Sequence, residues 1–254
     1  MNTIERTTLR IAAVADIHTK KTSQGAFQTL FTKATEEADV MLLCGDLTDY
    51  GAVEEARVLA KEITSSLRIP AIGVLGNHDF ESNHQDEIVK ILTDAGVTML
   101  DGDTVELHGV GFAGVKGFGG GFGRRALGAW GEKIIKDFVH EAVEEALKLE
   151  AALVRLRTPQ KIGVLHYSPI QATVQGEPLE IVAFLGSSRL EEPLDRYRVT
   201  AVFHGHAHRG SLEGRTKGNA PVYNVAMPLL TVSYPERAPF RLIEVPIGEP
   251  AFAG

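Results

Sequence analysis

The sequence predicts an α/β fold in which buried strands alternate with amphipathic helices. The strand-like apolar runs cover residues 9–15, 40–44 and 71–75, and the helical stretches cover 24–37, 54–67 and 85–95. Strands that are joined through helices run parallel in one sheet. The chain has 254 residues, of which 44% are hydrophobic, and this suits one globular domain with a substantial core over residues 1–254.

The second half of the chain predicts further strands around one long helix. Strand-like pieces lie at residues 97–100, 104–107, 111–115, 162–165, 199–204, 222–226 and 241–245. The first three indicate an antiparallel extension of a sheet. Between Glu132 and Arg157, apolar residues recur at steps of three and four, which predicts a helix that ends at Thr158-Pro159. We expect this helix to cover a sheet; a position over the site or in a homo-oligomer contact stays open.

Five short polar motifs follow predicted strands, and each sits where a strand ends. They are Asp16-Ile17-His18, Gly45-Asp46, Gly76-Asn77-His78-Asp79, His166 and Gly205-His206-Ala207-His208. Strand ends that gather at one rim of a sheet are where α/β proteins place their ligands. We therefore expect the five motifs to converge on one site.

The residue types in these motifs are those that hold two metal ions side by side. Two divalent ions about 3.5–4 Å apart need a ligand that touches both, and a carboxylate with two oxygens can do so. Asp46 is the candidate bridge. The remaining candidates divide into two sets, which are Asp16, His18 and His208 for the first ion and Asn77, His166 and His206 for the second. Spacing alone does not assign His206 and His208 to different ions. Imidazole with carboxylate and amide oxygens, and no thiolate, favours Mn or Fe, with Zn also compatible.

The charge of such a centre indicates its substrate. Two divalent cations carry four positive charges, and the carboxylates of Asp16 and Asp46 offset about two of them. The remaining positive charge favours a small anionic phosphate ester as the substrate. His78 lies beside the ligands and could donate a proton to the leaving oxygen. Asp49 could accept a hydrogen bond from His78 and hold it charged. His78 and Asp49 are therefore the candidate catalytic residues.

The order of the motifs resembles the calcineurin-like metallophosphoesterase superfamily from Asp16 to His208. The resemblance implies a four-layer αββα sandwich of two mixed β-sheets flanked by helices. It also implies that the residues named above hold a dinuclear metal centre, that a hydroxide bridging the metals attacks phosphorus, and that His78 and Asp49 act as a catalytic pair.

Two features refine the resemblance. Tyr50 follows Asp49 where the protein serine/threonine phosphatases of the superfamily have an arginine, so we do not expect a phosphoprotein substrate. The Gly-Asp-Leu-Thr-Asp-x-Gly segment is similar to the small bacterial members, which include cyclic-nucleotide phosphodiesterases and phosphomonoesterases. We expect hydrolysis of a small phosphodiester. A phosphomonoesterase of the same fold and a non-catalytic metal-binding interaction scaffold are the alternatives.

Composition limits the partners of the protein. The formal net charge of -7 and the pI near 5.7 argue against a surface that grips nucleic acid. No apolar run is long enough for a membrane helix, and the N-terminal residues do not resemble a signal peptide, so a cytoplasmic protein is expected. Cys44, the only cysteine, is expected to be a small buried residue.

The sequence says less about two loops, residues 116–125 and 167–196, and about the role of His204. Residues 116–125 contain five glycines, and they form either a solvated loop or a cover over the metal rim. In a cover, Phe118 or Phe122 would contact a base or aryl group, and Lys116, Arg124 or Arg125 would lie near the phosphate. Residues 167–196 are expected to be irregular because Pro193 interrupts any helix. We expect His204 to make hydrogen bonds near the rim without binding metal.

Overall fold

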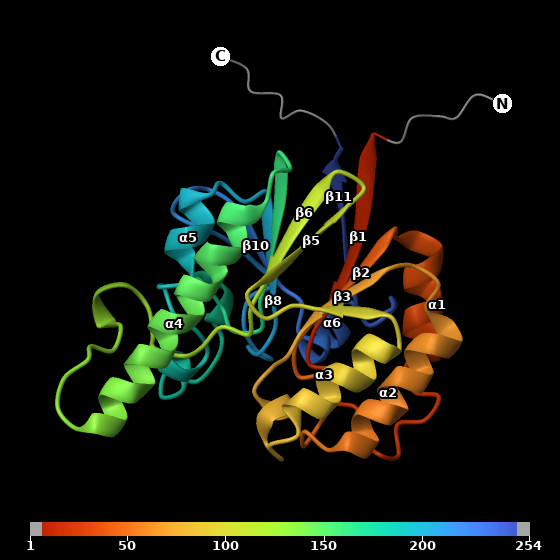
Figure 1. The fold of residues 1–254 in the computed structure, drawn as a ribbon, viewed down its shortest axis with the longest axis horizontal. Coiled ribbons are helices and arrows are strands. Elements are labelled where there is room, and N and C mark those ends of the chain that lie inside the picture. Colours follow the sequence, from red (N-terminus) through yellow and green to blue (C-terminus); the bar gives the residue numbers. More distant parts are fainter. Residues whose placement is uncertain (1–6, 248–254) are drawn as a thin grey trace.

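Two β-sheets packed face to face form the centre of the computed structural model, which describes residues 7–247 (Figure 1). The first sheet has the strand order β11-β1-β2-β3-β4. Its strands are β1 (Thr8–Val14), β2 (Val40–Cys44), β3 (Ala71–Val74), β4 (Val97–Met99) and β11 (Arg241–Pro246). The strands β1 to β4 run parallel, and β11 pairs antiparallel with β1.

The second sheet has the strand order β5-β6-β7-β8-β10-β9. Its strands are β5 (Asp103–Leu107), β6 (Val110–Gly114), β7 (Gln160–Val164), β8 (Ala201–His204), β9 (Glu213–Arg215) and β10 (Pro221–Asn224). The four central strands are parallel, and β5 and β9 pair antiparallel at the two edges. Both sheets are therefore mixed.

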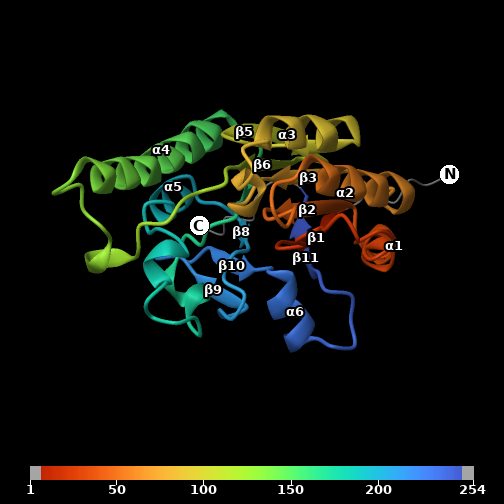
Figure 2. The same ribbon diagram turned by 90° about the horizontal axis from the view of Figure 1, so that it is seen from below.

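Helices cover the outer face of each sheet, which completes four layers (Figures 1 and 2). The first sheet is covered by α1 (Gln28–Glu37), α2 (Val53–Ser66) and α3 (Gln85–Asp94), and the second by α4 (Lys133–Arg155) and α5 (Glu191–Arg196). A further short helix, α6 (Met227–Ser233), leads towards β11. Within the described residues, no helix is both long and apolar enough to cross a membrane.

The alternation of side chains along each strand explains the layers. In β2, Leu42 and Cys44 face the second sheet, whereas Met41 and Leu43 pack against the helices on the outer side. Successive residues of a strand point to opposite faces, so a strand that is apolar on both faces must be covered twice. Cys44 is fully buried and free, as predicted.

The predicted α/β class and the four-layer architecture are confirmed, and the corrections are local. Residues 97–100 do not extend a sheet antiparallel, because β4 pairs parallel with β3. Pro193 does not prevent a helix, since it lies in the first turn of α5, where a backbone N–H has no partner within the helix. The strand β9 and the helix α6 were not predicted. The long helix covers the second sheet as expected, but it begins at Lys133 and leaves Ile134 and Ile135 exposed.

Candidate metal centre

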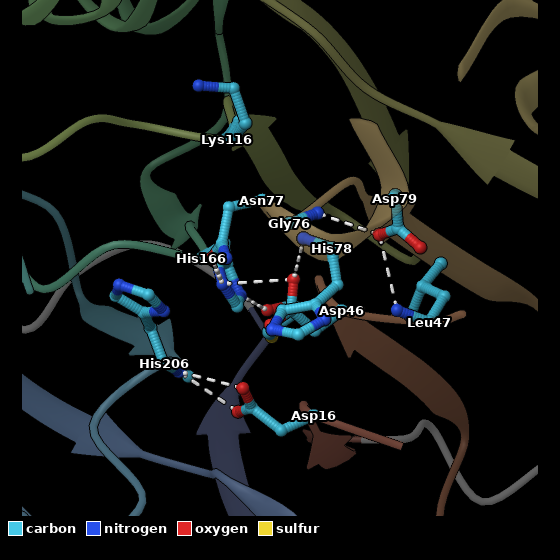
Figure 3. Close-up of polar contacts among 12 residues, drawn as sticks. Asp16, Asp46, Leu47, Gly76, Asn77, His78, Asp79, Lys116, His166 and His206 are labelled. Atoms are coloured by element: carbon cyan, nitrogen blue, oxygen red, sulfur yellow. Dashed lines mark hydrogen bonds and ion pairs between the residues drawn. The ribbon is translucent and has the colours of Figure 1, made fainter. Parts of the chain in front are cut away.

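Five loops that follow parallel strands bring the predicted ligands to one rim of the two sheets (Figure 3). Three of these loops follow β1, β2 and β3 in the first sheet, and two follow β7 and β8 in the second. Histidine and aspartate side chains from these loops form three groups whose donor atoms lie within 4.8 Å of one another. The groups are Asp16, His18 and His208; His18, Asp46 and His78; and Asp46, His166 and His206.

The first group joins the β1 and β8 loops. Nε2 of His208 lies 2.9 Å from Oδ1 of Asp16, which is fully buried. The main-chain N–H of His206 donates to both oxygens of Asp16, at 3.2 and 2.9 Å. Asp16 therefore orients the loop that carries both terminal histidines.

The second set of candidate ligands, which are Asp46, Asn77, His166 and His206, joins the loops after β2, β3, β7 and β8. Nε2 of His166 lies 3.3 Å from Oδ1 of Asp46 and 3.0 Å from Oδ1 of Asn77. Nδ1 of His166 donates to the carbonyl of Cys44 at 3.0 Å, which leaves Nε2 to face the site. Nε2 of His206 lies 3.2 Å from the carbonyl of Phe184, so donation there leaves Nδ1 as the ring nitrogen that could bind a cation.

Asp46 lies between the two sets of candidate ligands, with one carboxylate oxygen towards His166 and the other towards His18. Oδ1 faces His166, as described, and Oδ2 lies 3.7 Å from Nε2 of His18. The residue is 1% exposed, so solvent hardly screens its charge. This two-sided placement is the one that a bridging carboxylate requires.

The residues fit a pair of divalent cations. Nε2 of His18 is buried and makes no hydrogen bond among the described residues, and Oδ2 of Asp46 lies 3.7 Å from it. An unpaired buried polar atom is costly, and a cation would satisfy it. The side chains offer imidazole nitrogens, carboxylate oxygens and the amide oxygen of Asn77, while the Cys44 thiol is in none of the three groups. Such a set suits Mn, Fe or Zn.

Protonation of the metal-free site follows from burial and from the two aspartates. Burial lowers the pKa of His166, but the neighbouring Asp46 outweighs it and raises the pKa to about 9. Burial raises the pKa of Asp46, but the charge of His166 and a hydrogen bond with its ring hold this pKa below the usual range. Burial, with the charge of His166, lowers the pKa of His206 to about 3. His166 therefore carries a proton at neutral pH, whereas His206 does not.

The loops that carry the candidate ligands contain residues in the left-handed backbone conformation, which is typical of tight turns. Asp16, His18, Asp46 and His206 all have positive φ, between 45° and 69°. This conformation is unfavourable for non-glycine residues, and such strain is found where a side chain must be aimed. Gly76 explains part of the Gly-Asn motif, because a Cβ there would collide with the carboxylate and the main-chain nitrogen of Asp46.

Asp79, to which the sequence assigned no role, ties two of the ligand loops together. Its Oδ1 accepts from the N–H and the hydroxyl of Thr48, at 2.8 and 2.6 Å. Its Oδ2 accepts from the N–H of Gly76 at 2.8 Å and from that of Leu47 at 3.2 Å. Burial and the charge of Asp46 raise the pKa of Asp79 to about 6 against the effect of these hydrogen bonds. Its place in the Gly-Asn-His-Asp motif was the only signal in the sequence.

The expected bond between His78 and the Asp49 side chain is not made. Nδ1 of His78 lies 2.7 Å from the main-chain carbonyl of Asp49 and 3.5 Å from Oε2 of Glu81. The Asp49 carboxylate instead lies 3.3 Å from Nδ1 of His18 and 3.6 Å from Nζ of Lys20. Asp49 therefore faces His78 with its main-chain carbonyl and His18 with its carboxylate.

His204 makes the hydrogen bonds expected of it. It is fully buried, and its ring nitrogens lie 2.7 Å from the carbonyl of Gly205 and 2.8 Å from Oγ1 of Thr173. Thr173 lies in turn 2.8 Å from the hydroxyl of Ser168. Burial lowers the pKa of His204 to about 4, so the ring is neutral and links the β8 loop to the segment after β7.

The glycine-rich loop is buried over residues 119–122 and exposed over residues 123–125, and it corrects one expectation. The N–H groups of Gly120 and Gly121 donate to the carbonyls of Ala183 and Gly186, beside the Phe184 carbonyl that faces His206. Phe122 is only 7% exposed in a small core cluster, so it cannot contact a substrate ring. The loop therefore braces the segment next to the second ligand group.

Phe118 and the basic residues of the loop do not contact the ligand groups. The Phe118 ring packs against Phe138 at 4.8 Å and against Tyr167 at 5.8 Å, while Arg124 and Arg125 are exposed. The Lys116 amine donates to the carbonyl of Gly117 and is directed away from the cluster (Figure 3). Tyr167 was not predicted to be part of the site, although it follows His166. Its ring centroid lies 4.5 Å from that of His206.

The family model for calcineurin-like phosphoesterases matches residues 9–210. The chain belongs to the calcineurin-like phosphoesterase family. All five motifs lie within the matched region, and by this membership the protein is a phosphoesterase hydrolase of a metal-dependent family. No curated protein matches the chain.

Solved structures share the fold at low sequence identity. A phosphopantetheinyl hydrolase from Mycobacterium tuberculosis aligns with a TM-score of 0.68 at 14% identity, over 96% of this chain and 98% of that protein. TT1561 of Thermus thermophilus aligns with a TM-score of 0.54 at 15% identity, over 95% and 100%. GAP50, the anchor in the inner membrane complex of Plasmodium, aligns with a TM-score of 0.53 at 12% identity, over 88% and 73%. These likenesses concern the fold alone.

Proposed function

We propose that this calcineurin-like phosphoesterase hydrolyses a small phosphodiester at a centre of two divalent cations. The main support for this proposal is the position of Asp46, whose two carboxylate oxygens face His166 on one side and His18 on the other. The first cation would be held by Asp16, His18 and His208, the second by Asn77, His166 and His206, and Asp46 would be shared. When bound, such a pair activates water and neutralises charge on the phosphoryl oxygens.

His78 has the position of a proton donor in this proposal. Donation of its Nδ1–H to the carbonyl of Asp49, at 2.7 Å, leaves Nε2 as the nitrogen that can hold a proton towards the leaving oxygen. The T-shaped contact of its ring with His18, at 4.6 Å between centroids, keeps it beside the first ligand group. Asp49 acts through its carbonyl on His78 and through its carboxylate on His18.

The charge of the centre supports an anionic ester. Two divalent cations exceed the charge of Asp16 and Asp46 by roughly two units, and activation of a water removes about one. A phosphodiester carries one negative charge, which balances the roughly one positive charge that remains at the centre. Mn or Fe fits the mixed imidazole and oxygen donors, with Zn as the third candidate.

Parallel kinetics with a diester and a monoester test the proposal. The purified protein with added Mn²⁺ should hydrolyse bis-p-nitrophenyl phosphate with a higher kcat/KM than p-nitrophenyl phosphate. A preference for the monoester would identify a phosphomonoesterase instead. Turnover of neither ester would favour a metal-binding interaction scaffold. GAP50, which shares the fold, is described as an anchor.

A further inference from the structure

Tyr167 lies directly beside the second set of candidate ligands. Its ring centroid is 4.5 Å from that of His206 and 5.5 Å from that of His166. The N–H groups of His166 and Tyr167 both donate to the carbonyl of Lys116, each at 3.0 Å. The backbone of Tyr167 is therefore fixed together with that of a candidate ligand.

The hydroxyl of Tyr167 makes no hydrogen bond within residues 7–247, although the residue is only 8% exposed. The amine of Lys116, which lies 5.4 Å from the ring centroid, donates to the carbonyl of Gly117 instead. The hydroxyl oxygen is not one of the buried polar atoms that lack a partner, so solvent reaches it. An unpaired and accessible hydroxyl on an otherwise buried side chain is available to a ligand.

The charge of Asp46, the candidate bridging ligand, acts on this hydroxyl. Burial raises the pKa of Tyr167, and the charge of Asp46 raises it further. Coulomb interactions weaken with distance, so the hydroxyl lies within electrostatic range of the candidate bridge. A phenol keeps its proton at neutral pH in any case, and the hydroxyl can therefore donate a hydrogen bond.

The carboxylates of the site already accept other hydrogen bonds. Oδ1 of Asp46 accepts the N–H of His78 at 2.9 Å and lies 3.3 Å from Nε2 of His166. Both oxygens of Asp16 accept the N–H of His206. An anion that binds at the centre is the natural remaining acceptor, because two divalent cations would attract it there.

We propose that the Tyr167 hydroxyl donates a hydrogen bond to a phosphoryl oxygen of the ester, on the side of the second cation. Diesters and monoesters both carry such an oxygen, so the contact acts on both classes of substrate. The inference rests on the proposed function in one respect, which is that a phosphate ester binds at the metal centre. Tyr167 binds the substrate in this account and holds no cation.

Tyr167→Phe tests the contact because it removes the hydroxyl and keeps the ring against His206. With Mn²⁺ added, kcat/KM should fall roughly 10- to 100-fold for both bis-p-nitrophenyl phosphate and p-nitrophenyl phosphate, the effect of one hydrogen bond to a charged group. The melting temperature and the metal content should stay those of the wild type, since no internal hydrogen bond is lost. An unchanged kcat/KM, or a fall that a loss of bound metal accounts for, would overturn the inference.

Tyr197→Phe is the matched control. Tyr197 packs against the same core cluster to which Tyr167 belongs, but its hydroxyl donates to Glu150 at 3.4 Å, and it lies outside the three groups of donor side chains. It should leave kcat/KM and the metal content unchanged. Equal losses of kcat/KM in the two variants would contradict the proposed contact, because they would reflect a general effect on the shared cluster.

Binding of inorganic phosphate separates this inference from the proposed function. Titration calorimetry of the Mn-loaded protein measures this binding without turnover. The dissociation constant should rise roughly tenfold or more in Tyr167→Phe and stay unchanged in Tyr197→Phe. If neither ester is hydrolysed, the proposed function fails, and the titration still decides the role of Tyr167. Equal affinity in the wild type and Tyr167→Phe, or no binding to the wild type, would contradict the inference.

Discussion

The carboxylate of Asp79 holds Thr48 by two hydrogen bonds, one from its N–H at 2.8 Å and one from its hydroxyl at 2.6 Å. Thr48 follows Asp46 in the β2 loop, while Asp79 follows Asn77 in the β3 loop. With two further donors from Leu47 and Gly76, four hydrogen bonds fix these loops relative to each other. The separation between Asp46, the proposed shared ligand, and Asn77, the proposed amide ligand, therefore depends on Asp79, which lies outside the proposed ligand sets.

Asp79→Asn should weaken both folding and metal binding. Each oxygen of the Asp79 carboxylate accepts two hydrogen bonds, and in asparagine an NH₂ group, itself a donor, replaces one of these oxygens. Two hydrogen bonds are therefore lost, and we expect the free energy of unfolding to fall by about 2–4 kcal/mol. Because residues behind the ligands orient them, we expect the affinity for Mn²⁺ to fall roughly 10- to 100-fold. Denaturant unfolding and calorimetric titration measure the two effects.

Glu62→Gln is the control for Asp79→Asn. Glu62 is 4% exposed and accepts main-chain N–H groups of Gly25 and Phe27, at 2.7 and 3.2 Å, in a region outside the ligand groups. It should cost about 1–3 kcal/mol of stability and leave the metal affinity unchanged. Equal losses of metal affinity in the two variants would show that Asp79 has only a general structural effect.

Metal affinity should rise with pH. The pKa of His166 is raised to about 9 in the metal-free protein, so the ring is protonated at pH 7 and must lose that proton to bind a cation. Below this pKa, each unit by which the pH falls should therefore lower the affinity about tenfold through this group. Titration calorimetry in buffers with different heats of ionisation should detect release of about one proton or more. A heat that is independent of the buffer would argue against this protonation state.

His78→Ala should separate turnover from metal binding. Loss of a proton donor lowers kcat roughly 10²–10⁴-fold, most for esters with poor leaving groups. The metal content should stay that of the wild type, because His78 is not among the proposed ligands. His140→Ala, on the exposed surface of α4, should change neither quantity. Loss of an ion in His78→Ala would identify this histidine as a ligand.

Gly76→Ala should disturb the centre through its shape alone. The added Cβ would meet the carboxylate of Asp46 and lie 2.8 Å from the His166 ring, so one of the two must move. Forcing an extra methyl into such a contact costs about 1–3 kcal/mol, and we expect weaker metal binding with it. Gly123→Ala, which has open space around it, should keep full metal content when measured by elemental analysis.

The sequence predicted the parts of the fold and the site that depend on local patterns. Apolar runs marked the strands of both sheets except β9, and the polar residues after them converged because parallel strands end at one edge. Side-chain directions after a turn were not predictable. His78 meets the main-chain carbonyl of Asp49 rather than its carboxylate, and no local pattern in the sequence encodes that choice. The burial of Phe122 likewise depends on packing with Leu185 and Val174, which no local pattern encodes.

The central claim is that Asp46 binds two cations at once, and elemental analysis of Mn-loaded protein tests it most directly. The wild-type protein should hold two ions per chain, Asp16→Asn should lose mainly the first, and Asp46→Asn should fall below one because both sites share its carboxylate. An Asp46→Asn protein that is folded and retains two ions, or loses one and keeps the other at full affinity, would contradict the account.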